Sequence, residues 1–149
     1  MASDVDFGIV LGLAWQSFTD ALRADLSARG FDDLGSAYGY VFRALAAEAL
    51  HQNELARRLG MTAQGASKIV GEMVARGYVE RAPDPDDGRA HRLRLGERGR
   101  AALAAARRFH AGYERRLRAE LGERRVDELR RALEVMAGEA GSGAVLRAF

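Results

Sequence analysis

Four side chains that can donate hydrogen bonds lie close together in the middle of the chain, namely Thr62, Gln64, Ser67 and Lys68. Apolar residues recur among them at the spacing of a helix with one buried face: Ala66, Ile69, Val70 and Met73. Hydroxyl and amide groups donate to phosphate oxygens or read base edges, and a lysine can meet a phosphate or a guanine. The outer face of this predicted helix is therefore a candidate contact surface for nucleic acid.

Two glycines, Gly65 and Gly71, lie on the same outer face. Each lowers helix propensity by about 1 kcal/mol relative to alanine, so some contact should compensate for them. Close approach of the helix to a DNA backbone is one explanation, and close packing against a neighbouring helix is the other. We include Gly65 among the candidate DNA contacts.

The segment before this helix predicts a helix-turn-helix. Leu55, Ala56 and Leu59 share one face of a first helix, and Gly60 follows where a helix can end in a left-handed residue. Thr62 can then cap the second helix by accepting a backbone N–H bond. Gly77 ends that second helix, whose outer face is free to enter a major groove.

A β-hairpin is predicted directly after the second helix. Residues 78–81 form a short strand, and residues 92–95 alternate polar and apolar side chains as a half-buried strand does. Between them is a cluster of turn residues with two prolines, Pro83 and Pro85, which we place outside the strands. A helix-turn-helix with such a hairpin is a winged helix, and Arg92 on its returning strand is placed to reach a phosphate.

The order of these elements resembles the MarR family of transcriptional regulators. The resemblance rests on four short segments, residues 52–56 (QNELA), 76–81 (RGYVER), 84–90 (DPDDGRA) and 93–99 (LRLGERG), and with the flanking helices it extends over nearly the whole chain. His51 and Gly96 stand where the family usually has threonine. The resemblance implies a homodimeric regulator that binds a pseudo-palindromic operator, represses transcription and is released by a small ligand.

Within the hairpin, Asp87-Gly88-Arg89 matches an Asp-x-Arg pair that lies in the wing of MarR-like proteins. The resemblance implies that Arg89 enters the minor groove and that Asp87 orients its guanidinium. A narrow minor groove concentrates negative potential, which suits an arginine on a rigid hairpin. Asp84 and Asp86 are expected to add negative charge to the wing tip. The alternative is that the whole turn is an ordinary solvated surface.

Amphipathic helices are predicted on both sides of the winged helix, in residues 5–29 and 97–149. The winged helix does not need them, so we expect a dimerisation bundle; a bundle within a monomer is the alternative. The candidate interface residues are Leu11, Leu117, Leu129 and Leu133. The apolar tail 144–149 is expected to dock at the end of that interface.

The predicted fold is mainly α with a small two- or three-stranded β wing. We expect a single domain over residues 1–149, in which residues 36–96 form the winged helix-turn-helix and the N- and C-terminal helices form the dimerisation bundle.

A ligand site follows only from the resemblance, because MarR-like proteins often bind small aromatic or phenolic molecules between the bundle and the winged helix. Aromatic rings with polar tips suit such an effector. The candidate pocket residues are Trp15, Phe18, Tyr38, Phe42, His110 and Tyr113. Ordinary core packing is the alternative for each of them.

Composition excludes several classes of function. The 149 residues contain no cysteine, which rules out disulfides, thiolate metal sites and a cysteine redox switch. The histidines, His51, His91 and His110, are separated and form no ligand pair at helical spacing, so we expect no metal and no other cofactor. No apolar run approaches the roughly 20 residues of a transmembrane helix, and the acidic start lacks the basic flank of a secretory signal. We therefore expect a cytoplasmic protein without a membrane partner.

Charge is spread unevenly along the chain. The net charge is +2, and residues 1–50 carry three basic against seven acidic groups, a charge of −4, which leaves +6 for residues 51–149. This asymmetry fits a nucleic-acid surface in the later part, although solvated helix faces also use arginine. The expected partners are double-stranded DNA, a second copy of the chain and a small-molecule effector.

No catalytic constellation is present: the sequence has no Gly-x-Ser-x-Gly, no phosphate-binding glycine loop and no His-Glu-x-x-His. We therefore do not expect an enzyme. The second hypothesis is a winged-helix module for protein–protein contact without DNA, in which Lys68 and Arg89 would have no special role.

Overall fold

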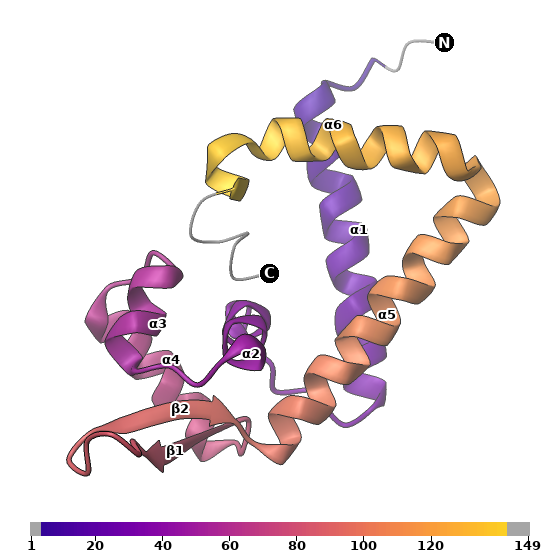
Figure 1. The fold of residues 1–149 in the computed structure, drawn as a ribbon. Coiled ribbons are helices and arrows are strands. Elements are labelled where there is room, and N and C mark those ends of the chain that lie inside the picture. Colours follow the sequence, from indigo (N-terminus) through magenta and orange to yellow (C-terminus); the bar gives the residue numbers. More distant parts are fainter. Residues whose placement is uncertain (1–3, 143–149) are drawn as a thin grey trace.

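In the computed structural model, which describes residues 4–142, a winged-helix part lies at one end and three long helices at the other (Figure 1). The helices and strands of the described chain are α1 (Phe7–Ala28), α2 (Tyr38–Ala47), α3 (Gln52–Arg58), α4 (Ala63–Ala75), β1 (Val79–Pro83), β2 (His91–Leu95), α5 (Glu97–Leu121) and α6 (Glu123–Ser142). This is the predicted order of elements, and it confirms the predicted fold class. The tail 144–149 lies outside the described residues.

The helix-turn-helix forms from local signals that the sequence carries. Gly60 ends α3 with a φ of +63°, a conformation that costs glycine little because it has no Cβ. Thr62 then caps α4, because its Oγ1 accepts a hydrogen bond from the N–H of Gly65 at 3.0 Å. The predicted cap is thereby confirmed, and the cap fixes where α4 begins.

One apolar core lies beneath α4 and the hairpin. Val70 and Met73 of α4 are fully buried, as the spacing of the apolar residues predicts. They pack with side chains from α2, α3 and the segment before it, the hairpin and the start of α5, which include Val41, Phe42, Leu45, Leu50, Leu55, Tyr78, Val79, Leu93, Leu95 and Leu103. Burying each large side chain of this kind stabilises the fold by about 1.5–3 kcal/mol. The core therefore holds the inner face of α4 and leaves its outer face exposed.

The wing is an antiparallel pair of strands in which Val79 faces Leu95 and Arg81 faces Leu93. Leu50 adds a short bridge to Leu93 on the other side of β2, with backbone bonds of 3.1 and 2.7 Å, so a third extended segment borders the sheet. The expectation that both prolines lie outside the strands is wrong for Pro83, which is the last residue of β1. Pro83 is tolerated there because β1 is an edge strand and its end lies next to the turn.

The start of α5 is packed tightly against the end of the winged helix. The N–H of Gly96 donates to the carbonyl oxygen of Tyr78 at 2.9 Å. A Cβ placed on Gly99 would lie 2.1 Å from the same oxygen. Only a glycine fits at that position, and this close approach sets where α5 leaves the sheet.

The long helices leave broad apolar faces uncovered in the single chain. In α1 only Leu26 is buried, and the exposed fractions of Phe7, Leu13 and Trp15 are 70%, 58% and 63%. On α6, Leu129, Leu133 and Met136 are also exposed. No helix of residues 4–142 has both the length and the apolar content that crossing a membrane would need.

Two helix glycines should respond in opposite ways to alanine. We expect Gly99→Ala to destabilise the fold by about 1–3 kcal/mol, because the new Cβ overlaps the Tyr78 carbonyl. We expect Gly71→Ala in α4 to stabilise it by about 1 kcal/mol, because nothing lies within 4 Å of the added Cβ. Urea unfolding followed by circular dichroism measures both. A Gly99→Ala protein as stable as the parent would contradict this packing of α5.

Candidate nucleic-acid interface

The outer face of α4 presents the polar side chains that the sequence analysis selected. Gln64, Ser67 and Lys68 are exposed and point away from the core. Thr62 is also exposed, but its oxygen already accepts the capping bond from Gly65, so only its own O–H remains to donate. The structure thus brings Gln64, Ser67 and Lys68 together on one open face, with Thr62 at its beginning.

Neither glycine of this face packs against a neighbouring helix. A Cβ on Gly65 would meet the Oγ1 of Thr62 at 3.1 Å, so Gly65 leaves room for the cap. Gly71 is exposed, and a Cβ there would meet nothing within 4 Å. Close packing against a neighbouring helix of the described chain therefore does not explain Gly71.

At the tip of the wing, Asp87 acts on the backbone of Arg89 and not on its guanidinium. The Asp87 Oδ1 accepts a hydrogen bond from the Arg89 N–H at 3.0 Å, and the Asp87 carbonyl accepts one from the Ala90 N–H at 3.1 Å. The Arg89 side chain is exposed. The expectation that Asp87 holds the guanidinium is thereby corrected: Asp87 shapes the turn from which Arg89 projects.

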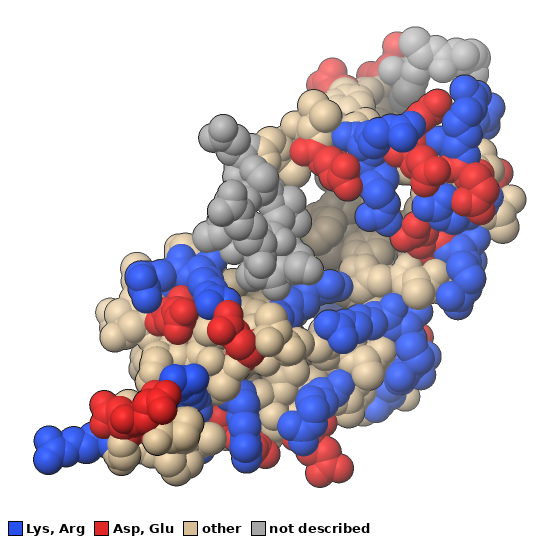
Figure 2. Space-filling model, viewed as in Figure 1, with Lys and Arg blue, Asp and Glu red and all other residues tan. Residues whose placement is uncertain are grey.

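Figure 2 shows both charge signs at the end of the wing, at the lower left of the view, with a basic group projecting furthest. Asp86 and Asp87 are exposed there, as is Arg89. The expectation that Asp84 adds to this surface charge is wrong, because only 5% of Asp84 is exposed.

Asp84 is instead a buried tie between the wing and α3. Its Oδ2 accepts a hydrogen bond from the Nε of Arg92 at 3.0 Å and lies 2.8 Å from the Nε2 of His51, and its Oδ1 accepts a hydrogen bond from the Asp86 N–H at 2.9 Å. The bond from the Asp86 N–H, followed by the bond from Arg92, holds the pKa of the Asp84 carboxyl below its ordinary value of 3.8. The carboxylate therefore stays charged and keeps its partners at neutral pH.

Two residues take roles that the sequence analysis did not foresee. Arg92, expected to reach a phosphate, directs its Nε to Asp84 and lies 3.6 Å from Asp86, so it braces the hairpin. His51 precedes α3 without capping it; its ring contacts Asp84 and lies with Nδ1 3.2 Å from the carbonyl oxygen of His91. The two prolines beside Asp84 signalled a turn, but nothing local in the sequence indicated that its carboxylate turns inward.

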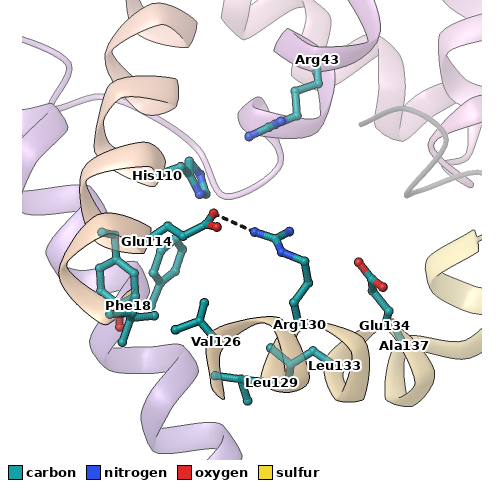
Figure 3. Close-up of a pocket in the computed structure, with 12 residues that line it drawn as sticks. Phe18, Arg43, His110, Glu114, Val126, Leu129, Arg130, Leu133, Glu134 and Ala137 are labelled. Carbon is teal, nitrogen blue, oxygen red and sulfur yellow. Dashed lines mark hydrogen bonds and ion pairs between the residues drawn. The ribbon is translucent and has the colours of Figure 1, made fainter. Parts of the chain in front are cut away.

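A cavity of about 650 Å³ lies between the long helices and α2 (Figure 3). Of the six predicted pocket residues, Phe18, His110 and Tyr113 line it. The other three do not: Tyr38 and Phe42 are buried in the winged-helix core, and Trp15 is exposed on α1, where its ring stacks on Phe18 at 6.0 Å. The six residues therefore lie in three environments: the cavity, the winged-helix core and the exposed surface of α1.

The upper wall of this cavity is positively charged and partly desolvated. Figure 3 shows the Arg43 side chain reaching from α2 towards His110. Burial, with the positive charge of Arg107 added, lowers the pKa of Arg43. Burial, with the positive charge of Arg43 added, lowers the pKa of His110. Lower in the cavity, Glu114 is paired with Arg130 at 2.7 Å. The lowered pKa favours the neutral form of His110, so Arg43 is the positive group of this wall, and a partly desolvated arginine favours an anion beside it.

The predicted interface leucines do not lie in one environment either. Leu11, Leu129 and Leu133 are exposed, and Leu117 is half-buried beside the cavity, whose apolar wall also includes Leu129 and Leu133. Among the described residues, no group of three or more histidine, aspartate or glutamate side chains is arranged to hold a metal ion.

The sequence is similar to a family model and to a curated protein. The MarR family model matches residues 32–90. A curated relative, the "Exopolysaccharide II synthesis transcriptional activator ExpG" of Rhizobium meliloti (strain 1021), is 32% identical over 108 residues. This match includes 72% of the chain and 56% of the relative, so the chain spans little more than half of that protein's length.

Solved structures share the fold. A mutant MarR from E. coli complexed with operator DNA aligns with a TM-score of 0.65 at 22% identity, over 87% of this chain and 91% of that one. A MepR mutant from S. aureus bound to an oligodeoxyribonucleotide aligns with a TM-score of 0.64 at 18% identity, over 92% and 99% of the two chains.

The Asp84 tie predicts a pH-dependent loss of stability. A carboxyl whose pKa is lower in the folded than in the unfolded state stabilises the fold above the unfolded-state pKa, and this contribution disappears as the pH falls through the folded-state value. We expect Asp84→Asn to be clearly less stable than the parent at pH 7, with the difference shrinking as the pH falls below 3.8. Urea unfolding between pH 7 and pH 2 measures it.

The exposed Asp86→Asn is the matched control for that series, since it lies at the same turn and should change stability little at any pH. A constant difference between the parent and Asp84→Asn across the range would contradict the buried tie.

Proposed function

Because residues 32–90 match the MarR family model, we propose that the chain is a regulator of this family that binds a pseudo-palindromic DNA operator as a homodimer and regulates transcription. The observation that carries the proposal is that the winged helix exposes a basic side chain on α4 and another on its wing. Lys68 is exposed on the open face of α4, and Arg89 is exposed on the wing. A helix face in the major groove and an arginine in the adjacent minor groove are compatible with one duplex.

We assign these residues different tasks on the DNA. Gln64 and Ser67 carry groups that read base edges, whereas Lys68 and Arg89 supply charge. Asp87 supports Arg89 through the turn, as its bond to the Arg89 N–H indicates. Because the exposed Gly71 brings no side chain to the same face, the α4 backbone can approach phosphates closely there.

A dimer is supported by the apolar surface that a single chain leaves exposed. Large side chains on α1 and α6, including Phe7, Leu13, Trp15, Leu129 and Leu133, lie in water in the monomer. Exposed apolar patches of this kind on a protein usually mark an interface. A symmetric dimer would bury the same faces of both chains and would present two copies of α4 to two half-sites. A protein that binds the chromosome shares its compartment, so the expected cytoplasmic location forms part of this proposal.

We expect repression as the regulatory outcome, because a dimer bound over a promoter blocks polymerase. The curated relative is named an activator, and a dimer bound beside a promoter can act in that sense. A reporter fused to the bound promoter distinguishes them: loss of the gene raises expression under repression and lowers it under activation.

We further propose that the cavity binds a small aromatic anion as effector. Its apolar wall and the aromatic side chains of Phe18 and Tyr113 suit a ring, and the partly buried Arg43, with the His110 imidazole beside it, suits a carboxylate. The cavity lies where α2 of the winged helix meets the long helices α1, α5 and α6. A ligand there contacts both parts at once, so it can couple effector binding to the placement of α4.

The DNA proposal is tested by removing one charged side chain, Arg89, and one side chain expected to contact a base edge, Gln64. We expect Arg89→Ala to weaken binding to the operator and to random duplex alike and to reduce the salt slope by about one unit. We expect Gln64→Ala to cost about 1–3 kcal/mol on the operator and little on random DNA. Fluorescence anisotropy over a salt series measures both, with duplexes selected by the parent from a random pool.

The exposed Arg131→Ala on α6 is the control for these variants, and it should bind as the parent does. If the parent binds no duplex at any salt concentration, the DNA proposal fails, and the winged helix is then better explained as a protein-interaction module.

The effector proposal is tested with a matched acid and amide. We expect 4-hydroxybenzoate to raise the melting temperature and to weaken DNA binding, because a ligand at 100 times its Kd stabilises the state it binds by about 2.7 kcal/mol. We expect 4-hydroxybenzamide, which lacks the charge, to have a smaller effect. Arg43→Met should abolish the difference between the two, whereas the exposed Arg57→Met on α3 should keep it. An equal response to acid and amide in the parent would exclude an anion site.

A further inference from the structure

The carboxylate of Asp33 lies at the joint between the long helices and the winged helix, in the loop that connects α1 to α2. The Nη1 of Arg98 donates to its Oδ2 at 3.0 Å and the Nη2 to its Oδ1 at 3.1 Å. The hydroxyl of Tyr78 donates to Oδ1 as well. We call these three residues the Asp33 clamp.

The clamp gathers chain segments that are far apart in the sequence. Arg98, in the first turn of α5, also donates to the carbonyl oxygens of Arg76 at 3.0 Å and Gly30 at 3.3 Å, and its guanidinium lies 4.4 Å from the centre of the Tyr78 ring. Arg76, which ends α4, in turn donates to the carbonyl oxygen of Asp33 at 2.7 Å. The end of α1, the end of α4, the residue before β1 and the start of α5 thus meet within one hydrogen-bonded group.

The ionisation of these groups keeps the clamp closed at neutral pH. Burial works against the charge of Asp33, but the bonds from Tyr78 and Arg98 outweigh it and hold the pKa of the Asp33 carboxyl below its ordinary value. Burial, together with the bond to Asp33, raises the pKa of the Tyr78 hydroxyl, which therefore remains a donor. Each group keeps the protonation state that its bonds require.

The clamp has the directionality that the surrounding apolar contacts lack. α2 and β2 pack on α5 through apolar side chains, and apolar contact resists separation without fixing an angle. A bidentate arginine–carboxylate pair fixes both the distance and the plane of its partners. Together with the Gly96–Tyr78 backbone bond and the close approach of Gly99 to Tyr78, the clamp therefore fixes the angle at which α5 leaves the end of α4.

A small rotation at this joint has a large effect at the far end of α4. The 13 residues of α4 span about 20 Å, and the clamp holds their C-terminal end. A tilt of about 10° would move the other end by about 3.5 Å, which is close to the rise of one base pair along B-DNA.

We propose that the Asp33 clamp sets the distance between the two copies of α4 in the dimer, and hence the half-site spacing that the operator must have. Asp33, Arg98 and Tyr78 are positioning residues: they touch no DNA and act through the orientation of α4. The inference rests on the proposed function, because spacing has meaning only for a dimer that reads two half-sites.

The distance between the two helices can be measured without DNA, because the chain has no cysteine of its own. Ala63→Cys puts a single spin label on the exposed far end of α4 in each protomer, and electron–electron double resonance then gives the distance between the two labels. We expect one narrow distance in the labelled parent. Asp33→Asn and Tyr78→Phe should broaden this distance or shift it by several ångströms. Arg98→Lys keeps the positive charge, so its distance should change less.

The matched control is Asp32→Asn, the same change in the neighbouring exposed residue, which should keep the distance of the parent. Circular dichroism at the temperature of the measurement verifies that each variant is folded, and Tyr78→Phe, which removes only one hydroxyl, provides the mildest opening of the clamp.

The second measurement uses duplexes that the parent selects from a random pool, remade with the half-sites one base pair closer or further apart, and a duplex with one half-site. We expect the parent to lose about tenfold or more in affinity when the spacing changes, and Asp33→Asn to lose less than about threefold. Affinity for the single half-site should be the same in both.

Each outcome decides between the two levels of the argument. An unchanged narrow distance and an unchanged spacing preference in Asp33→Asn would overturn the clamp inference alone, as would an equal loss on the single half-site, which would indicate damage to α4 itself. A parent that gives no label–label distance, or selects no duplex, would overturn the proposed function and the inference with it.

Discussion

The fold is organised around the burial of one tyrosine. The side chain of Tyr78 is fully buried, its ring contacts those of Tyr38 and Phe42, and its hydroxyl donates to Asp33. Its backbone is equally occupied: the N–H donates to the carbonyl oxygen of Met73 at 2.8 Å, and its own carbonyl accepts from Gly96. Tyr78 thus lies where α4, the wing and α5 meet, and its backbone is bonded to Met73 of α4 and to Gly96, the residue before α5. Because all of its polar groups are bonded inside the protein, the elements that meet there cannot separate without leaving buried groups unpaired.

Two carboxylates then fix the parts that the apolar core leaves free to move. Asp84 ties the wing to the residue before α3 and to the returning strand, and Asp33 ties the end of α4 to the start of α5. Both remain ionised because their hydrogen bonds outweigh the cost of burial. The contrast with Asp87 is instructive, since that exposed carboxylate bonds only to a backbone N–H of its own turn. Asp33 and Asp84 therefore act as supports that join elements of the fold.

The arginines divide in the same way. Arg92, Arg98 and Arg118 form ion pairs with carboxylates of other segments. Arg118, for example, bridges Glu114 and Asp127 across the turn between α5 and α6. Arg89 on the wing and Lys68 on α4 are exposed, so their charge faces outward. Arg43 is a third kind: it is partly buried beside His110 with like charges near it. An arginine-rich composition by itself does not distinguish these three environments, because the same side chain occurs in all of them.

Local patterns in the amino-acid sequence were enough to predict the parts of the fold that depend on neighbours within a few residues. The stripe of Val70 and Met73, the cap at Thr62, the left-handed Gly60 and the alternation of β2 are local patterns, and they predicted the helix-turn-helix, the wing and the open face of α4 correctly. Such patterns act over one turn or one strand pair, where the spacing of residues decides which side chains share a face.

The partner that each face meets became clear only from the packing of the elements against one another. Tyr38 and Phe42 were apolar on the expected side of α2, yet that side turns into the core and away from the cavity. Arg92 had the expected place on β2, but it meets Asp84, and the inward turn of Asp84 also recruits His51 from another element. The residues of the Asp33 clamp lie up to 65 positions apart. Spacing along the chain fixes the direction of a side chain within its element, whereas its partner depends on how separate elements pack, and no local pattern records that.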